Sequence, residues 1–149
     1  MNEVLKDLAT YTGIALGGYT ALLAGAQLIE VASEKITSQE QLDRIVDEES
    51  DKIGLDKRLV VGKFYAAGDK NYHTIRGARC FIEDFNLEKR TIPIKVVEIK
   101  EGWGARRGAV RHELYHLKKH LPRKNKNFLK SFFIEEPTAT LYALTGINL

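Results

Sequence analysis

Two histidines four residues apart, with a glutamate directly after the first, are the side chains of this chain best suited to chemistry. They are His112, Glu113 and His116, within the segment RHELYH. On a helix, residues four apart lie on one face, so the two imidazoles can reach a common point. Two imidazole nitrogens form half of a zinc site, and a carboxylate beside the first can act as a general base towards a water held there. The spacing therefore predicts a hydrolytic zinc site on a helix.

The third ligand must come from another element. The only cysteine, Cys80, excludes a thiolate cluster, so nitrogen and oxygen donors are expected, and Cys80 itself is expected to be a buried strand residue. His120 follows His116 by one turn, but three successive histidines on one helix diverge from a single metal, so we expect His120 on the surface or beside the ligands. Two adjacent glutamates, Glu135 and Glu136, are the better candidates.

The elements that would position these residues predict an α+β fold. The chain has 149 residues with ordinary apolar content, which is enough for one domain with its own core. Periodicity and residue type distinguish helical segments from segments rich in β-branched and aromatic residues. The predicted helices are 37–54, 105–121 and 135–146, and the predicted strands are 58–66, 77–85 and 91–101. We expect a small, mainly antiparallel three-stranded sheet, with Pro93 placing the third strand towards an edge.

Capping residues support the helix boundaries. Thr37 or Ser38 can cap the helix of residues 37–54, and Gly54 stands where its end is expected. The last helix has Pro137 in its first turn and Gly146 at its end. Both helices therefore have start and stop signals.

The N-terminal segment is apolar and has several interpretations. Residues 8–29 carry no charge and are long enough to cross a bilayer as a helix. A membrane anchor or interfacial helix, a buried or propeptide-like helix, and a cleaved signal peptide are the alternatives. We expect an N-terminal segment, 1–36, with a catalytic domain over 37–149, and a membrane-associated or cytoplasmic protein.

Basic residues gather around the histidines. Residues 106–130 contain nine basic side chains and one acid, Glu113. Such a stretch can attract nucleic acid, acidic peptide or anionic lipid, or can be a solvated face followed by a charged loop. No nucleic-acid fingerprint accompanies it, so nucleic acid is not an expected partner.

The segments RHELYH and IEEPTA together resemble the gluzincins, thermolysin-like zinc peptidases in which HExxH precedes a glutamate ligand on the next helix. The small size is similar to that of the minigluzincins, the very small archaeal members, and the likeness covers 37–149. A metzincin pattern is excluded, because Lys119 and Pro122 stand where its glycine and third histidine would be.

The resemblance implies a zincin-like fold and a zinc ion (Zn2+) held by His112, His116 and Glu136, with Glu135 as the substitute ligand. Glu113 would be the general base for hydrolysis of a peptide or protein. The family usually has an acid or Asn where Thr140 stands, to support a ligand histidine, so the departure puts that support in doubt.

The resemblance also implies an extended substrate antiparallel to residues 94–99, and a latent or zymogen-like state shielded by a terminal segment. Tyr142, Tyr115 and His73 are candidate oxyanion donors by residue type. Cys80 could instead cap the zinc.

Three other interpretations of the motif stay open. One is a charged amphipathic helix without a metal. Another is a metal-binding module without turnover, or a target-specific regulator similar to the peptidase-like domains that act on bacterial repressors. The last is a basic module that docks on nucleic acid or membrane.

Overall fold

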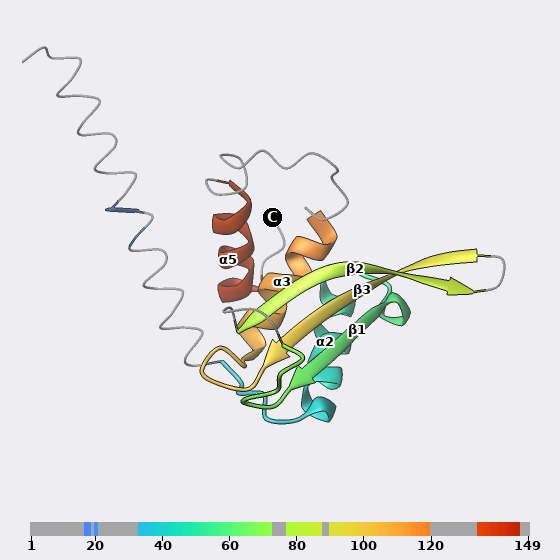
Figure 1. Ribbon diagram of the computed structural model, residues 1–149. Helices are drawn as coiled ribbons and strands as arrows, with labels where there is room; N and C mark the ends of the chain where they lie inside the picture. The colour runs from blue at the N-terminus through green and yellow to red at the C-terminus, as the bar shows by residue number, and fades with distance from the viewer. Residues whose placement is uncertain are drawn as a thin grey trace, which may run out of the picture.

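The computed structural model describes residues 17–18, 20, 33–72, 77–87, 90–119 and 134–146. These residues form an α+β fold of three helices and one small sheet, shown in Figure 1. The elements are α2 (Gln39–Ile53), the short 3-10 helix η1 (Lys57–Leu59), β1 (Val60–Tyr65), β2 (Ala78–Leu87), β3 (Arg90–Lys100), α3 (Arg107–Lys119) and α5 (Glu136–Thr145). All lie within or close to the predicted ranges.

The ends of α2 confirm the predicted caps. Ser38 is the N-cap, and its hydroxyl accepts a hydrogen bond from the backbone N–H of Gln41. The Gln41 side chain accepts one in return from the N–H of Thr37, at 2.8 Å. Gly54 ends the helix with φ of 71°, a left-handed conformation that favours glycine. Local sequence therefore determines where α2 begins and ends.

The sheet has the order β1-β3-β2 and is mixed, which corrects the expectation of a mainly antiparallel sheet. β2 and β3 pair antiparallel as a hairpin, whereas β1 and β3 pair parallel. The connection over residues 66–77 takes the chain from β1 to the far side of β3. β2 runs opposite to β1, and β3 turns back from β2 and lies between the two strands. β3 therefore runs in the same direction as β1.

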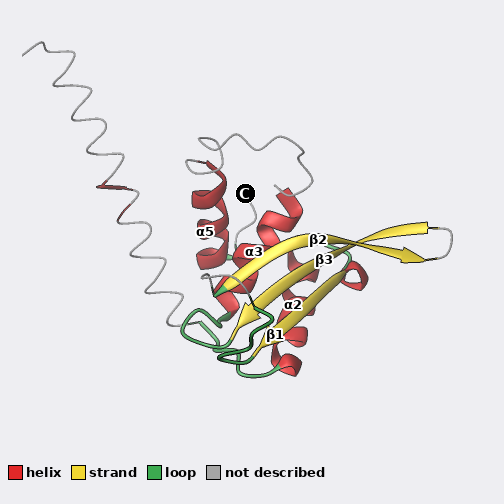
Figure 2. Cartoon of the chain, viewed as in Figure 1, coloured by secondary structure: helices red, strands yellow, loops and turns green. Residues whose placement is uncertain are grey.

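The expectation that Pro93 places β3 at an edge is wrong for the strand as a whole. β3 is central from Lys95 to Lys100, where β1 pairs on one side and β2 on the other. Before Lys95, residues 90–94 of β3 pair with β2 alone and form a two-stranded arm, visible in Figures 1 and 2. Pro93 lies in this arm opposite Asp84, and no third strand of the described chain pairs with it. Such a position at the edge of a sheet is one where proline is commonly found.

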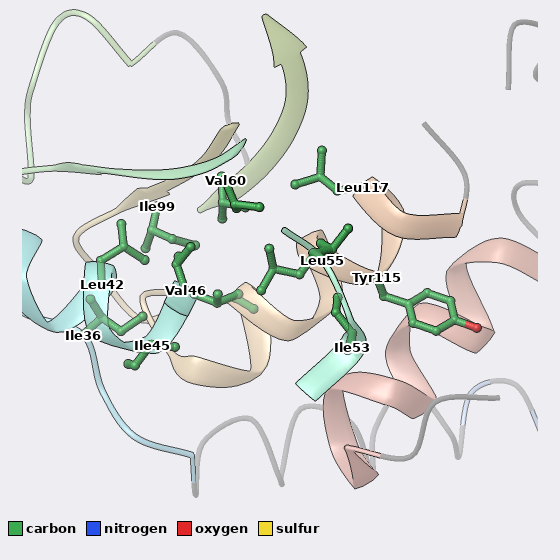
Figure 3. Packing of buried hydrophobic residues seen from close by; sticks show 14 of the residues in the cluster. Ile36, Leu42, Ile45, Val46, Ile53, Leu55, Val60, Ile99, Tyr115 and Leu117 are labelled. Atoms are coloured by element: carbon green, nitrogen blue, oxygen red, sulfur yellow. The ribbon is translucent and has the colours of Figure 1, made fainter. Parts of the chain in front are cut away.

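Helices α2 and α3 pack together on the same face of the sheet, behind the strands in the view of Figure 2. Figure 3 shows Leu42 and Val46 of α2 beside Ile99 of the sheet, and Val60 of β1 and Leu117 of α3 belong to the same cluster. These side chains are almost completely excluded from water. Helix α5 packs on α3 rather than on the sheet. The core therefore fixes α3, and α3 in turn supports α5.

The predicted N-terminal helix lies outside the described residues, except for Gly17, Gly18 and Thr20, which are helical. No helix in the part of the chain that the structure describes combines the length and apolar character needed to cross a bilayer. Residues 33–36 pack with the body of the fold, since Ile36 is buried and its N–H donates to the Ala105 carbonyl at 2.8 Å. The boundary after residue 36 and the role of residues 8–29 stay predictions.

Candidate metal centre

Helix α3 carries the histidines because its other side is anchored in the core. Val110, Leu114 and Leu117 are completely buried, whereas His112 and His116 are half-buried. Lys118, a polar residue within this helix, donates from its Nζ to the carbonyl of Ile53 at the end of α2. Lys118 therefore satisfies a carbonyl at the end of α2, and it is half-buried.

Two imidazoles from α3 and one carboxylate from α5 converge on a single point. The Nε2 atoms of His112 and His116 lie 3.1 Å apart. Glu136 Oε2 lies 3.3 Å from His112 Nε2, and Glu136 Oε1 lies 3.7 Å from His116 Nε2. One ligand atom from each residue can be chosen so that all lie within 4.8 Å of one another. The three side chains with the predicted ligand spacing are thus brought together.

The donor set and its spacing fit a zinc ion. Zinc takes imidazole nitrogen and carboxylate oxygen at about 2.0–2.2 Å, so neighbouring ligand atoms in a tetrahedral shell are about 3.3 Å apart. The contacts between His112 and His116 and between His112 and Glu136 are 3.1 and 3.3 Å. Three protein ligands would leave one position open, as catalytic zinc sites require.

Electrostatics keep the carboxylate of this cluster ionised. Hydrogen bonds from His112 and then from His116 hold the pKa of Glu136 well below its usual range, although partial burial acts in the opposite direction. An ionised carboxylate is the form that coordinates a cation. Glu136 is therefore ready to act as a ligand at neutral pH.

Glu113 lies beside the cluster on α3 and is half-buried. It follows His112 by one residue, which corresponds to about 100° of rotation around the helix. No hydrogen bond or ion pair joins its side chain to any other residue that the structure describes. Its carboxylate is therefore not used to hold the fold together.

The start of α5 separates the roles of the adjacent glutamates. Glu135 is only 7% exposed and does not belong to the His–His–Glu cluster. Glu136 opens the helix beside Pro137, which removes no helical hydrogen bond in the first turn. The geometry thus favours Glu136 over Glu135 as the third ligand.

Thr140 does not support either histidine. It is buried on α5, but its hydroxyl makes no hydrogen bond to a residue in the described ranges. The support that the family resemblance implies at this position is therefore missing from the geometry.

The candidate oxyanion donors Tyr115 and Tyr142 belong to the core. They are 4% and 1% exposed, and their rings stack with centroids 5.2 Å apart. His73 and His120 lie outside the described residues. Cys80 is half-buried on β2, opposite Val97, and packs against the core, which favours its interpretation as a strand residue.

Residues 94–99 do not form a free edge, which corrects the expected substrate position. From Lys95 to Ile99, β3 pairs with β1 on one side and β2 on the other, so an added peptide has no free backbone groups to bind there. Among the described strands, the outer sides of β1 and β2 and the arm of β3 are the open edges.

The described part of the basic stretch is engaged within the protein. Arg107 and Arg111 bind acidic residues of α2. Arg106 donates to the carbonyls of Trp103 and Ser33, and Lys119 lies over the Tyr115 ring. These four basic residues therefore have partners within the protein.

Glu49 is the residue near the site that the motif analysis did not single out. It is completely buried in α2 and binds arginines of α3. The signal was present in the sequence, because Glu49 stands at the apolar spacing set by Leu42, Ile45 and Val46. A charged residue at such a position requires a buried partner.

Comparison with known proteins finds no matching protein-family model, and no curated protein and no solved structure matches the chain significantly.

Proposed function

We propose that the protein is a zinc-dependent metallopeptidase, with His112, His116 and Glu136 as metal ligands and Glu113 as the general base. The observation that carries the proposal is the approach of two imidazole nitrogens and one carboxylate, from two helices, to within 4.8 Å. The half-buried Glu113 beside them has no structural partner among the described residues. A carboxylate that is costly to bury and makes no stabilising contact is better explained by chemistry than by folding.

Each side chain has a definite part in the reaction. A zinc ion held in the site would act as a Lewis acid and lower the pKa of a water to about 7. Glu113 accepts a proton from the attacking water and later delivers it to the amide nitrogen, so that the amine leaves without a negative charge. His112 and His116 bind through neutral imidazoles, and Glu136 contributes the negative charge that partly balances a divalent cation.

An extended peptide is the substrate class that suits the sheet. The outer side of β2 pairs with no other strand among the described residues, and α3 packs against β2. A peptide added there would exchange main-chain hydrogen bonds with β2 while its scissile bond faces the helix that carries the histidines. The open edge thus supports peptide hydrolysis over hydrolysis of a small ester.

A metal-binding module without turnover is the second candidate. It is favoured by Thr140, which makes no hydrogen bond to either histidine at the position where the family resemblance implies a supporting side chain. This candidate predicts the same metal content and differs only in catalysis.

The test combines metal content with hydrolysis in the full chain. Zinc per chain is measured by elemental analysis for the wild type, His116→Ala and Glu113→Gln, and cleavage of an unstructured protein substrate is followed with zinc added. We expect about one zinc in the wild type and in Glu113→Gln, loss of zinc in His116→Ala, and cleavage by the wild type alone.

The outcomes separate the candidates. Zinc binding without cleavage in the wild type would favour the module without turnover. Cleavage that persists in Glu113→Gln would reject Glu113 as the base. Absence of zinc from the wild type, even after reconstitution, would reject the metal centre itself.

A further inference from the structure

Glu49 of α2 is a buried carboxylate that faces α3. Its side chain is 0% exposed, although it lies on the same helical face as apolar core residues. Burial of a carboxylate is strongly unfavourable unless the charge is paired and hydrogen-bonded. Glu49 can therefore be buried in its ionised form only because other side chains pair with it.

Two arginines from successive turns of α3 hold this carboxylate. Arg107 Nε donates to Glu49 Oε1 at 2.6 Å. Arg111 binds both oxygens, through Nε to Oε2 at 2.9 Å and through Nη2 to Oε1 at 3.1 Å. Lys52 Nζ adds a contact to Oε1 at 2.9 Å. Because the fork of Arg111 matches the carboxylate at two points, the pair restricts orientation as well as distance.

This clamp acts at the end of α3 that leads into the metal centre. Arg111 directly precedes His112, and Arg107 lies one turn earlier. Side-chain tips on a helix lie about 5–6 Å from its axis, so a rotation of about 10° would move them by roughly 1 Å. Metal–ligand distances tolerate only about 0.2 Å. A rotation of a few degrees in α3 is thus enough to spoil the site.

Glu49 also lies near the helix that supplies the third donor. Burial and the charge of Glu49 together raise the pKa of Tyr142, which is on α5. Tyr142 stacks on Tyr115 of α3 and lies on the same helix as Glu136. The carboxylate is thus tied by Arg107 and Arg111 to α3, and α3 is joined to α5 by the stacked tyrosines.

We propose that Glu49 is a positioning residue of the metal centre: through Arg107 and Arg111 it sets the rotation of α3 that turns His112 and His116 towards Glu136. The proposal rests on the proposed zinc site. A buried ion pair is weak evidence for stability, since apolar residues of the same volume often stabilise a fold as well or better. The two-point contact between Arg111 and Glu49 adds a directional constraint to the apolar packing that already anchors α3.

The experiment compares zinc affinity and imidazole geometry in variants of the full chain. Glu49→Gln keeps the shape of the side chain and removes its charge. Arg111→Lys keeps the charge and removes the two-point contact, and it is the milder variant if Glu49→Gln fails to fold. Gln39→Ala is the matched control, because the side-chain hydrogen bonds of Gln39 join the same helix α2 to Gly62 and Phe64 of β1, and none goes to a described residue of α3.

Zinc affinity is measured by competition with a chelator at a temperature where every variant is folded. The 15N-coupled imidazole signals of His112 and His116 are recorded separately in metal-free protein. We expect Glu49→Gln and Arg111→Lys to weaken zinc binding about tenfold and to shift both imidazole signals, in the range known for residues that orient ligands. Gln39→Ala should lower the melting temperature and leave both the zinc affinity and the imidazole signals unchanged.

Unchanged zinc affinity and unchanged imidazole signals in both variants would overturn the positioning role. A wild type that binds no zinc would reject the proposed function, and the metal-free signals would still decide whether Glu49 orients the histidines. Equal effects in Gln39→Ala would reduce Glu49 to a general contributor to stability and overturn the proposal.

Discussion

Tyr115 and Tyr142 stack with ring centroids 5.2 Å apart and an interplanar angle of 28°. This contact joins the helix that carries both histidines to the helix that carries Glu136, since Tyr115 is on α3 and Tyr142 is on α5. Both rings are almost completely buried. The stacked pair is therefore the apolar link that brings the imidazoles within reach of the carboxylate.

Removal of the Tyr142 hydroxyl should not harm the protein. The hydroxyl is buried and has no hydrogen-bond partner among the described residues, and burial with the Glu49 charge raises the pKa of Tyr142 to about 12. Tyr142→Phe removes this unsatisfied group and keeps the stacked ring, so we expect a free energy of unfolding that is unchanged or up to about 1 kcal/mol higher. Chemical denaturation measures it.

Tyr142→Ala is the control, and it should lose about 3–5 kcal/mol because it removes the ring itself. Peptide cleavage by Tyr142→Phe should equal that of the wild type. If cleavage is lost while stability is kept, Tyr142 acts on the substrate and its assignment to the core alone is incomplete.

Replacement of the adjacent glutamates should have opposite effects on metal and on fold. Glu136→Ala removes a member of the cluster, and we expect zinc affinity to fall by more than about 100-fold, beyond the loss typical for residues that only orient ligands. Glu135→Ala removes a buried residue outside the cluster and should lower the melting temperature while zinc affinity is kept. Chelator competition and thermal unfolding distinguish them, and the reverse pattern would assign the ligand to Glu135.

Local signals allowed much of the helical frame to be predicted. The Ser38 and Gly54 caps, and Pro137 with Gly146 at the two ends of α5, act within a few residues and can be recognised without tertiary information. The convergence of His112 and His116 follows from their spacing of four on one helix. These features needed no knowledge of the packed structure.

The strand order could not be predicted in the same way. Composition identifies strands, but the parallel pairing of β1 with β3 depends on where the chain crosses after β1, and no local residue specifies that crossing. The partner of Glu49 likewise lies 58 residues away, at Arg107. The distance between Glu136 and the histidines depends in turn on how α5 packs on α3 through Tyr115 and Tyr142.

Gly62 should not accept a side chain. A Cβ at this position in β1 would lie 2.8 Å from Cγ of Leu42 and 3.3 Å from Cγ2 of Val46, both on α2. We expect Gly62→Ala to lower the free energy of unfolding by about 1–3 kcal/mol through overpacking. The double variant with Leu42→Ala should lose less stability than the sum of the losses in the two single variants, because alanine at position 42 makes room for the new side chain. Strict additivity in denaturant unfolding would contradict the clash.

Glu49 should make stability depend on pH in the acid range. Arg111, Lys52 and Arg107 surround its carboxylate and lower its pKa from 4.5 to about 2, against the effect of burial. Its charge in turn adds to burial in raising the pKa of Tyr142 on α5. The unfolded state therefore binds a proton near pH 4.5 that the folded state takes up only near pH 2. This contribution to stability, on the order of 3 kcal/mol, is complete at neutral pH and is lost as the pH falls from about 5 to 2.

Urea unfolding from pH 7 to pH 3 tests this dependence in Glu49→Gln. The variant should be less stable than the wild type at pH 7, and the difference between the two should shrink as the pH falls, because the wild type loses what the variant already lacks. Glu40→Gln removes an exposed carboxylate from the first turn of the same helix and is the matched control. It should follow the wild type at every pH. A difference in stability between Glu49→Gln and the wild type that stays constant down to pH 3 would contradict this prediction. It would mean that Glu49 has the same pKa in the folded and unfolded states, and that the arginine clamp does not keep it ionised.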